Sequence, residues 1–257
     1  MKGALLFFSC ILLLLAGCIQ PPQPQGNGKF FEATAQDPEC QNNICFYEIF
    51  ALDDGLVMVK KHITGSDYGI SFCDANREKQ SALFSFLEQN LKENKLGECG
   101  GCHSLHIFYN NGTTTRYSSI PYKSAVFEKQ FFNEAQGICS AATEAEFIHV
   151  IFGKKDKYSD YHIFSNNKMV VSKFGLREGE LLESGVDEIS AAEFSEMKSF
   201  IPEQFFSSKA PGNCQANGYF YGYFEAYIGG KYNYAFTCGD GSDAGKAFLA
   251  FAGRFSE

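Results

Sequence analysis

The 257-residue chain contains no tryptophan and little positive charge, with 22 Lys and Arg residues against 30 Asp and Glu residues and a net charge of −8. This acidic balance argues against a nucleic-acid binder, because such proteins carry a basic footprint. The absence of tryptophan weakens the case for a sugar-binding platform. Hydrophobic residues nevertheless make up 45% of the chain and charged residues 20%, which excludes a disordered protein.

The N-terminal apolar run, Ala4 to Ala16, is too short for a comfortable bilayer crossing, which needs about 20 apolar residues. It follows Met1-Lys2 and leads into Leu15-Ala16-Gly17-Cys18, in which small residues precede a cysteine. This segment resembles the leader and lipobox of prokaryotic lipoproteins. The resemblance implies a signal peptide over residues 1–17, cleavage before Cys18 and attachment of lipid to the Cys18 sulfur.

The segment after the leader predicts a spacer. Gln20 to Gly28 contains three prolines and no apolar residue, so residues 18–29 are interpreted as the lipidated cysteine and an extended tether. We therefore expect a protein held on the membrane by its lipid and facing the extracytoplasmic side, at the cell surface or in the periplasm.

Beyond the anchor, eight cysteines remain, an even number that predicts disulfide bonds outside the cytoplasm. Cys214 and Cys238 are alone in the last hundred residues, and we expect them to pair with each other. The six others lie in the first half and are expected to pair among themselves. They are Cys40, Cys45, Cys73, Cys99, Cys102 and Cys139.

The two halves of the chain carry similar segments in the same order. Tyr47–Phe50, a polar turn and Leu56–Val59 match Tyr161–Phe164, a polar turn and Met169–Val171, with an offset of 114 residues before the turn and 113 after it. Such ordered similarity indicates an internal repeat. We expect two related units, over residues 30–140 and 141–257.

Each unit is predicted to be hairpin-helix-hairpin-helix, which gives an α+β fold with an antiparallel sheet packed by helices on one face. Hairpin turns are expected at Asp53–Gly55, Asn110–Gly112, Asn166–Lys168 and Gly229–Gly230. Helices are expected over residues 74–97 and 124–136, from the capping box at Ser190 to before Pro202, and from Ser242 onward. The 27 phenylalanines are interpreted as the filling between sheet and helices.

Cys99-Gly-Gly-Cys102-His103 is the sharpest chemical motif in the chain. Its C-x-x-C-H pattern resembles the c-type haem attachment site, in which both thiols bind the porphyrin and the histidine binds iron. The same pair of cysteines fits a redox dithiol or disulfides. Because strand residues three apart point to opposite faces, His103 and His106 argue against a zinc site here, and we expect no metal site.

The segment from Tyr219 to Phe236 alternates cleanly between two faces. Tyr219, Tyr221, Tyr223 and Tyr227 share one face with Glu225, and phenylalanines occupy the other. The phenylalanine face is predicted to be core. The tyrosine face is either a cross-strand ladder or a ligand-binding platform.

The favoured hypothesis is a binding module of the cell envelope, with a protein, peptide or envelope component as its partner. The alternative is an extracytoplasmic redox or c-type haem protein that uses Cys99, Cys102 and His103. The glycine-rich segment Gly239–Lys246 lacks phosphate-loop spacing, so no nucleotide is expected. No hydrolase motif is present, and enzymatic activity is not favoured. His62, His149 and His162 are interpreted as scattered surface or packed side chains.

Overall fold

The computed structural model describes residues 28–36, 44–63, 68–91, 104–112, 115–121, 135, 137–154, 157–175, 181–207, 221–237 and 243–255. These residues form thirteen strands, three α-helices and one 3₁₀ helix, an α+β fold as the sequence predicts. None of these described helices is both long and apolar enough to span a membrane.

The first half builds an antiparallel seven-stranded sheet in the order β6-β5-β1-β2-β3-β4-β7. Its elements are β1 (Phe30–Gln36), β2 (Ile44–Leu52), β3 (Leu56–Ile63), β4 (Tyr68–Ala75), α2 (Arg77–Asn90), β5 (Ser104–Asn110), β6 (Thr115–Pro121) and β7 (Cys139–Thr143). A disulfide between Cys73 and Cys139 joins β4 to β7, so two of the six first-half cysteines pair with each other as expected.

The second half builds an antiparallel six-stranded sheet in the order β11-β10-β9-β8-β12-β13. Its elements are β8 (Phe147–Lys154), β9 (Lys157–Phe164), β10 (Lys168–Gly175), β11 (Leu181–Glu188), α4 (Ala191–Ser199), η2 (Glu203–Ser207), β12 (Tyr221–Ile228), β13 (Lys231–Thr237) and α5 (Asp243–Phe255). If β8–β13 are replaced one for one by β1–β6, this order becomes β4-β3-β2-β1-β5-β6. That is the order of the first sheet read in reverse, without β7.

The expected hairpin-helix-hairpin-helix order is incomplete, because four successive strands precede the helix in each half. The repeat inferred from the sequence did not include β1 and β4 in the first half, or β8 and β11 in the second. The ladder registers also correct the offset between the halves. Ala51 pairs with Val57 and Ile163 pairs with Met169, so the offset is 112 residues on both strands of the hairpin.

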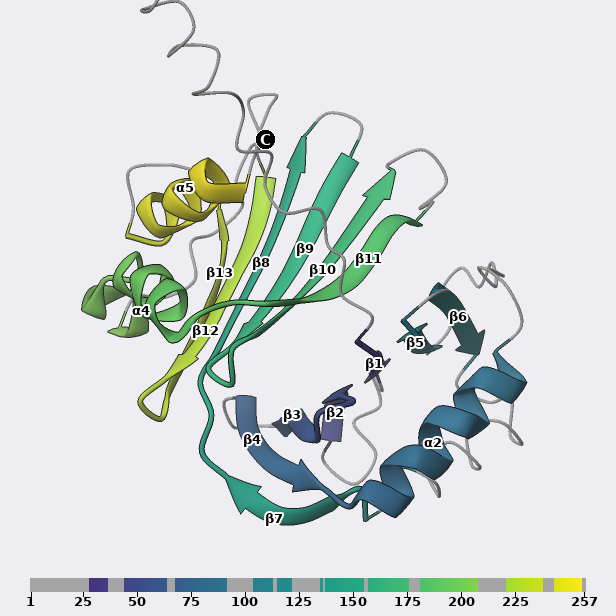
Figure 1. Cartoon of the computed structure of the whole chain (residues 1–257). Helices are drawn as coiled ribbons and strands as arrows, with labels where there is room; N and C mark the ends of the chain where they lie inside the picture. Colours follow the sequence, from purple (N-terminus) through teal and green to yellow (C-terminus); the bar gives the residue numbers. More distant parts are fainter. Residues whose placement is uncertain are drawn as a thin grey trace, which may run out of the picture.

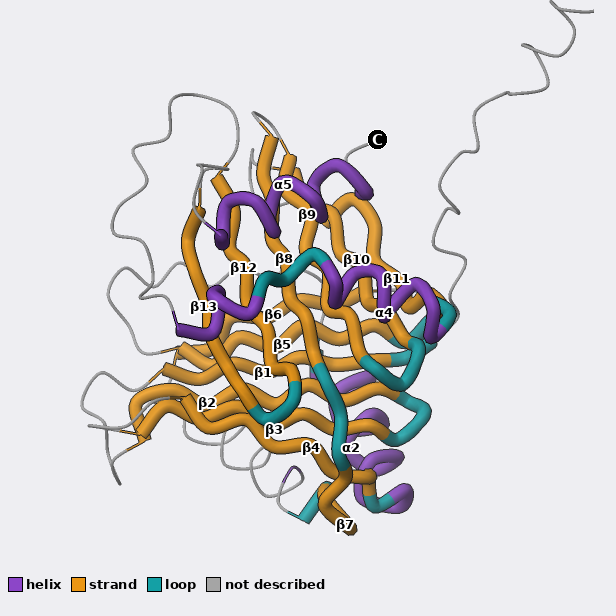
Figure 2. Tube along the Cα trace, turned by 90° about the vertical axis from the view of Figure 1, so that its left-hand side faces the viewer, coloured by secondary structure: helices purple, strands orange, loops and turns teal. Residues whose placement is uncertain are grey.

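The two sheets pack face to face, and the described helices lie on their outer faces (Figure 1). α2 covers the first sheet, and α4 and α5 cover the second, which gives four layers. Figure 2 shows that the strands of one sheet cross those of the other. Phenylalanine fills the layer between the sheets as well as the two helix–sheet layers, a packing that the sequence did not predict. The inter-sheet phenylalanines are Phe30, Phe50, Phe72, Phe108, Phe147 and Phe164.

The predicted hairpin turns all join adjacent strands of the structure. The capping box is confirmed, because the Ser190 hydroxyl accepts from the Glu193 amide and the Glu193 carboxylate accepts from the Ser190 amide. α5 begins at Asp243, close to the predicted Ser242, and buries Phe248 and Phe251. The predicted 124–136 helix lies outside the described residues except Ala135.

The prediction for the first helix was wrong at both ends. Asp74 belongs to β4, and the helix begins only after Asn76, whose side chain accepts a hydrogen bond from the Lys79 amide at 3.1 Å. The helix ends at Asn90 because Leu91 is extended, well before Gly97. The residue that caps the helix is therefore Asn76, two positions beyond the predicted start.

Candidate functional site: a buried ionic cluster between the sheets

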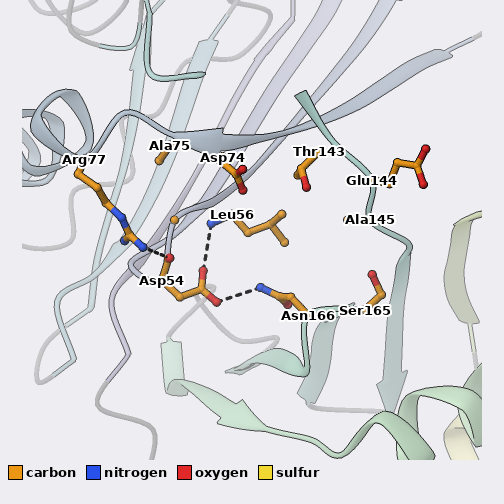
Figure 3. Close-up of a pocket in the computed structure, with 11 residues that line it drawn as sticks. Asp54, Leu56, Asp74, Ala75, Arg77, Thr143, Glu144, Ala145, Ser165 and Asn166 are labelled. Atoms are coloured by element: carbon orange, nitrogen blue, oxygen red, sulfur yellow. Dashed lines mark hydrogen bonds between the residues drawn. The ribbon is translucent and has the colours of Figure 1, made fainter. Parts of the chain in front are cut away.

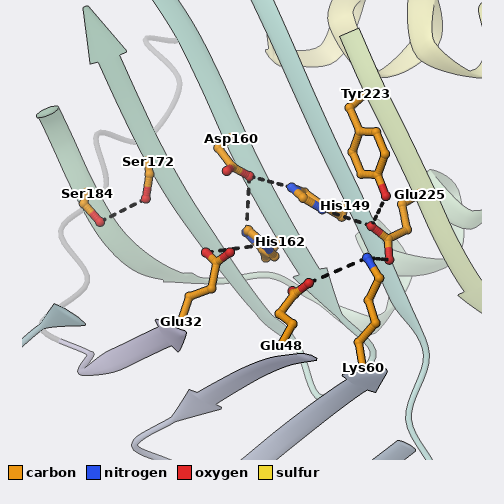
Figure 4. A network of polar contacts seen from close by, with 10 residues as sticks. All are labelled: Glu32, Glu48, Lys60, His149, Asp160, His162, Ser172, Ser184, Tyr223 and Glu225. Carbon is orange, nitrogen blue, oxygen red and sulfur yellow. Dashed lines mark hydrogen bonds and ion pairs between the residues drawn. The ribbon is translucent and has the colours of Figure 1, made fainter. Parts of the chain in front are cut away.

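Ionisable side chains from both sheets meet in the layer between them (Figure 4). They are Glu32, Glu48 and Lys60 from β1, β2 and β3, and His149, Asp160, His162 and Glu225 from β8, β9 and β12. We call these seven residues the inter-sheet cluster. Burying charge costs free energy unless each group is paired, so such a concentration needs a physical explanation.

The cluster follows from the alternation of the strands. In β2, Ile49 and Ala51 pack toward α2, whereas Phe50 and Leu52 pack between the sheets, which places Glu48 on the inter-sheet face. With the offset of 112 residues, Glu48 corresponds to Asp160 in β9. Each sheet therefore brings an acidic side chain at a corresponding strand position to the layer between the sheets.

Lys60 and Glu225 form the central ion pair. The Lys60 Nζ lies 2.6 Å from Glu225 Oε1 and 3.6 Å from Glu48 Oε2. The Tyr223 hydroxyl donates to Glu225 Oε2 at 2.6 Å. Burial alone would raise the pKa of Glu225, but Lys60 and His149 hold it well below its usual range. Glu225 is thus a carboxylate with no exposed surface whose charge is compensated by lysine.

His149 carries the second buried positive charge. Its Nε2 lies 2.9 Å from Asp160 Oδ1 and its Nδ1 lies 3.4 Å from Glu225 Oε2. Burial would lower the pKa of His149, but these two carboxylates raise it to about 10. The protonated imidazole donates from both nitrogens, and together with His162 it lowers the pKa of Asp160 despite the burial of that carboxyl group.

His162 behaves in the opposite way. Burial and the charge of His149 lower its pKa to about 3, so its imidazole is neutral. Its Nδ1 lies 3.3 Å from Asp160 Oδ1, and the negative charge of that carboxylate favours the tautomer with the ring proton on Nδ1. Its Nε2 is buried and has no hydrogen-bond partner in the described part of the chain, with Glu32 Oε2 4.0 Å away.

The two remaining carboxyl groups, Glu32 and Glu48, are less well compensated. Burial, followed by the charges of Glu48 and Asp160, raises the pKa of Glu32 to about 8. Burial also raises the pKa of Glu48, although Lys60 opposes the shift. Both carboxyl groups therefore favour a proton or another positive charge beside them.

This cluster was not predicted from the sequence. His149 and His162 were expected to be scattered side chains, whereas their rings stack with centroids 4.0 Å apart. A signal was present, because single charged or histidine residues interrupt apolar runs in mid-strand, as in Phe147–Phe152 and Phe46–Leu52. In a strand buried on both faces, a polar residue needs a partner from the opposing sheet.

The structure places part of the predicted tyrosine face in the same layer. Tyr223 donates to Glu225, and the Tyr227 ring packs 5.7 Å from the Phe72 ring of the first sheet. The opposite face of β12 is core as predicted, with Phe224 and Ala226 fully buried under the helices. Tyr219 and the Tyr221 side chain lie outside the described residues.

The other predicted site residues are also outside the described ranges. These are Cys18, Cys99, Cys102, His103, Cys214 and Cys238. The lipid anchor, the haem or redox motif and the second disulfide therefore stay predictions.

A pocket of about 400 Å³ lies where the β2–β3 turn, the β9–β10 turn and the β7–β8 connection meet (Figure 3). Asp54 accepts from the Leu56 amide at 3.0 Å and from the Asn166 side chain at 2.9 Å. Arg77 donates to the carbonyls of Asp53 and Asp54. The Asp54–Asn166 hydrogen bond links the two hairpin turns, so this region joins the two sheets, and Arg77 connects α2 to the β2–β3 turn.

Comparison with known proteins matched the chain to no family model and to no curated protein sequence.

Proposed function

We propose that this protein is a lipid-anchored extracytoplasmic binding module of the cell envelope, with a protein, peptide or envelope component as its partner. The leader ending in Cys18 supports the anchor and the location. The aromatic surface beside the inter-sheet cluster supports the binding role. We also propose that residues 30–140 and 141–257 are related units, which the shared strand order of the two sheets supports.

The observation that carries the proposal is an aromatic ladder on the β12–β13 hairpin, formed by Tyr223, Tyr232, Tyr234 and Phe236. The Tyr223 ring lies 5.1 Å from the Phe236 ring and 6.2 Å from the Tyr234 ring, and Tyr232 and Tyr234 are 6.1 Å apart. Phe236 is 58% exposed at the end of this ladder. Tyrosine rings combine an apolar body with a polar tip and are enriched at protein interfaces, which supports a recognition role for this row.

Two residues of the inter-sheet cluster contact the ladder. The Tyr223 hydroxyl is fixed by Glu225, and the Lys60 Nζ lies 5.8 Å from the centroid of the Tyr232 ring. Rigid aromatic side chains lose little conformational entropy on binding. β13 is also the last strand of its sheet among the described strands, a position where an extended peptide can add as a further strand.

The binding role is tested by panning a random-sequence peptide display library against the purified protein. Enriched peptides should bind the Phe236→Ala variant about tenfold more weakly than the wild type, because one exposed ring contributes on the order of 1–2 kcal/mol. Leu249→Ala is the matched control, since Leu249 is a similarly exposed apolar side chain on α5. Equal affinities of the two variants, or no enriched peptide, would contradict the proposal.

The anchor is tested separately with Cys18→Ser. The wild type should fractionate with membranes and gain the mass of attached lipid, whereas the variant should do neither. An unchanged membrane fraction and an unmodified wild-type Cys18 would overturn the lipid anchor without touching the binding role.

A further inference from the structure

The Nε2 atom of His162 is the most unusual atom of the inter-sheet cluster. The neighbouring Asp160 draws the ring proton to Nδ1, so Nε2 presents a lone pair. That lone pair lies in a buried region 4.0 Å from a carboxylate oxygen of Glu32, and oxygen lone pairs repel it. A positive species between the two atoms would turn this repulsion into attraction.

The charge balance of the cluster indicates how much positive charge is missing. Lys60 pairs with Glu225 and His149 pairs with Asp160, which leaves Glu32 and Glu48 without a full counter-charge of their own. When all four carboxyl groups are ionised, the cluster carries two more negative than positive charges. One divalent cation restores neutrality, and a buried site strongly favours neutrality.

We propose that His162 Nε2, Glu32 and Glu48 form a binding site for a divalent transition-metal cation, with zinc as the best fit. One ligand atom from each of these residues lies within 4.8 Å of the others. Zinc prefers imidazole nitrogen and carboxylate oxygen at about 2.0–2.2 Å, so small side-chain movements bring all three ligands to bonding distance. This site lies beyond the binding role proposed above and does not depend on it.

The surroundings supply the other parts of a metal site. Asp160 Oδ1 lies 3.3 Å from the non-ligating Nδ1 of His162. A carboxylate in this position is the third member of a carboxylate–histidine–metal arrangement, which orients and strengthens a histidine ligand. Glu32 is 25% exposed on its side chain, whereas His162 is 3% exposed. The cation therefore enters past Glu32, and water reaches the fourth coordination position from the same side.

A second set of residues, His149, Asp160 and His162, is equally compact. In that set, however, both nitrogens of His149 already contact carboxylates, Asp160 through Nε2 and Glu225 through Nδ1. Metal binding there would break these contacts and displace a buried proton. The set that contains the unpartnered nitrogen is therefore the favoured one.

The test is equilibrium dialysis of the metal-stripped full-length chain, purified in detergent, against ZnCl2, with bound metal measured by mass spectrometry. The wild type should bind one zinc ion more tightly than Glu32→Gln by about 100-fold or more. His149→Gln removes a ligand of the other set and a neighbouring positive charge, and should bind zinc at least as tightly as the wild type. Glu183→Gln, a carboxylate change on β11 outside the cluster, is the control and should bind zinc as the wild type does. Circular dichroism verifies that each variant is folded.

No zinc uptake by the wild type, or unchanged affinity in Glu32→Gln, would overturn the proposal. Loss of binding in His149→Gln with retention in Glu32→Gln would assign the metal to the other set and overturn it equally. If a variant does not fold, the absorption spectrum of the Co²⁺-loaded wild type decides. Weak d–d bands without thiolate charge-transfer bands support a nitrogen–oxygen site, whereas thiolate bands place the metal on cysteines.

Discussion

The imidazole rings of His149 and His162 stack with their centroids 4.0 Å apart and an interplanar angle of 18°. Two protonated rings at this distance would repel each other strongly in a buried layer. The pair avoids this repulsion because His149 is protonated between two carboxylates, whereas His162 stays neutral. One stacked pair thus supplies both a fixed positive charge and a free ring nitrogen.

Replacing Lys60 should be among the most destabilising single changes in the inter-sheet layer. Lys60→Met leaves Glu225 buried without its main counter-charge, and the free energy of unfolding should fall by roughly 3–5 kcal/mol. Urea denaturation measures the change. The double variant Lys60→Met/Glu225→Gln should recover part of the loss, and Lys168→Met, which breaks an ion pair at the surface, should have a much smaller effect. Equal effects of Lys60→Met and Lys168→Met would contradict the account.

The stability of the metal-free protein should depend on pH through the histidine pair. The pKa of His149 is raised from 6.5 to about 10, so its stabilising contribution is fully present below pH 6.5 and is lost as the pH rises toward 10. The pKa of His162 is lowered to about 3, so its contribution is lost as the pH falls from 6.5 toward 3. Denaturation midpoints in EDTA should decline on the alkaline side, and His149→Gln should flatten that decline. A wild-type slope retained in His149→Gln would assign the decline to other groups.

The disulfide between Cys73 and Cys139 should contribute substantially to stability. It closes a loop between residues 66 positions apart, and chain-entropy arguments give about 4 kcal/mol for such a loop. The double variant Cys73→Ala/Cys139→Ala should therefore unfold at a markedly lower denaturant concentration. Non-reducing peptide mapping should recover the two cysteines in one linked pair. Alkylation of Cys73 without reductant would contradict the assignment.

Gly222 permits the close packing of α5 on the second sheet. A Cβ atom at this position would overlap the Phe248 ring and come 2.8 Å from the Ile151 carbonyl oxygen. Gly222→Ala should therefore lower the free energy of unfolding by about 1–3 kcal/mol, because the helix must shift. Gly253→Ala within α5 is the control, since a Cβ there contacts nothing within 4 Å and alanine favours the helix. If Gly222→Ala left the free energy of unfolding unchanged while Gly253→Ala lowered it, this packing of α5 on the second sheet would be contradicted.

Local features of the fold were predictable because they depend on neighbouring residues. The Gly229–Gly230 turn and the Ser190–Glu193 capping box are examples, and both are confirmed. The offset between the halves was wrong by one to two residues because similar letters, such as Tyr47 and Tyr161, were aligned instead of turn positions. The registers of the two hairpins align the halves correctly.

The packing of the sheets on each other was not predictable in this way. Alternation in β2 separates Glu48 from Ile49, but it does not say which surface lies opposite each face. The β2–β3 hairpin places Lys60 directly opposite Glu48. Nothing near these residues in the sequence identifies His162 or Glu225 as their neighbours, because those contacts form only when two sheets from different halves meet. The candidate site is thus a product of tertiary structure, and the sequence carries only its polar interruptions.

The most direct test of the inter-sheet cluster as a metal site is anomalous diffraction at the zinc edge from crystals of zinc-loaded protein. The account predicts one anomalous peak within about 2.2 Å of His162 Nε2 and of one oxygen each from Glu32 and Glu48. A peak bound by His149, or no peak between the sheets in a crystal whose zinc sits only on cysteines, would contradict it.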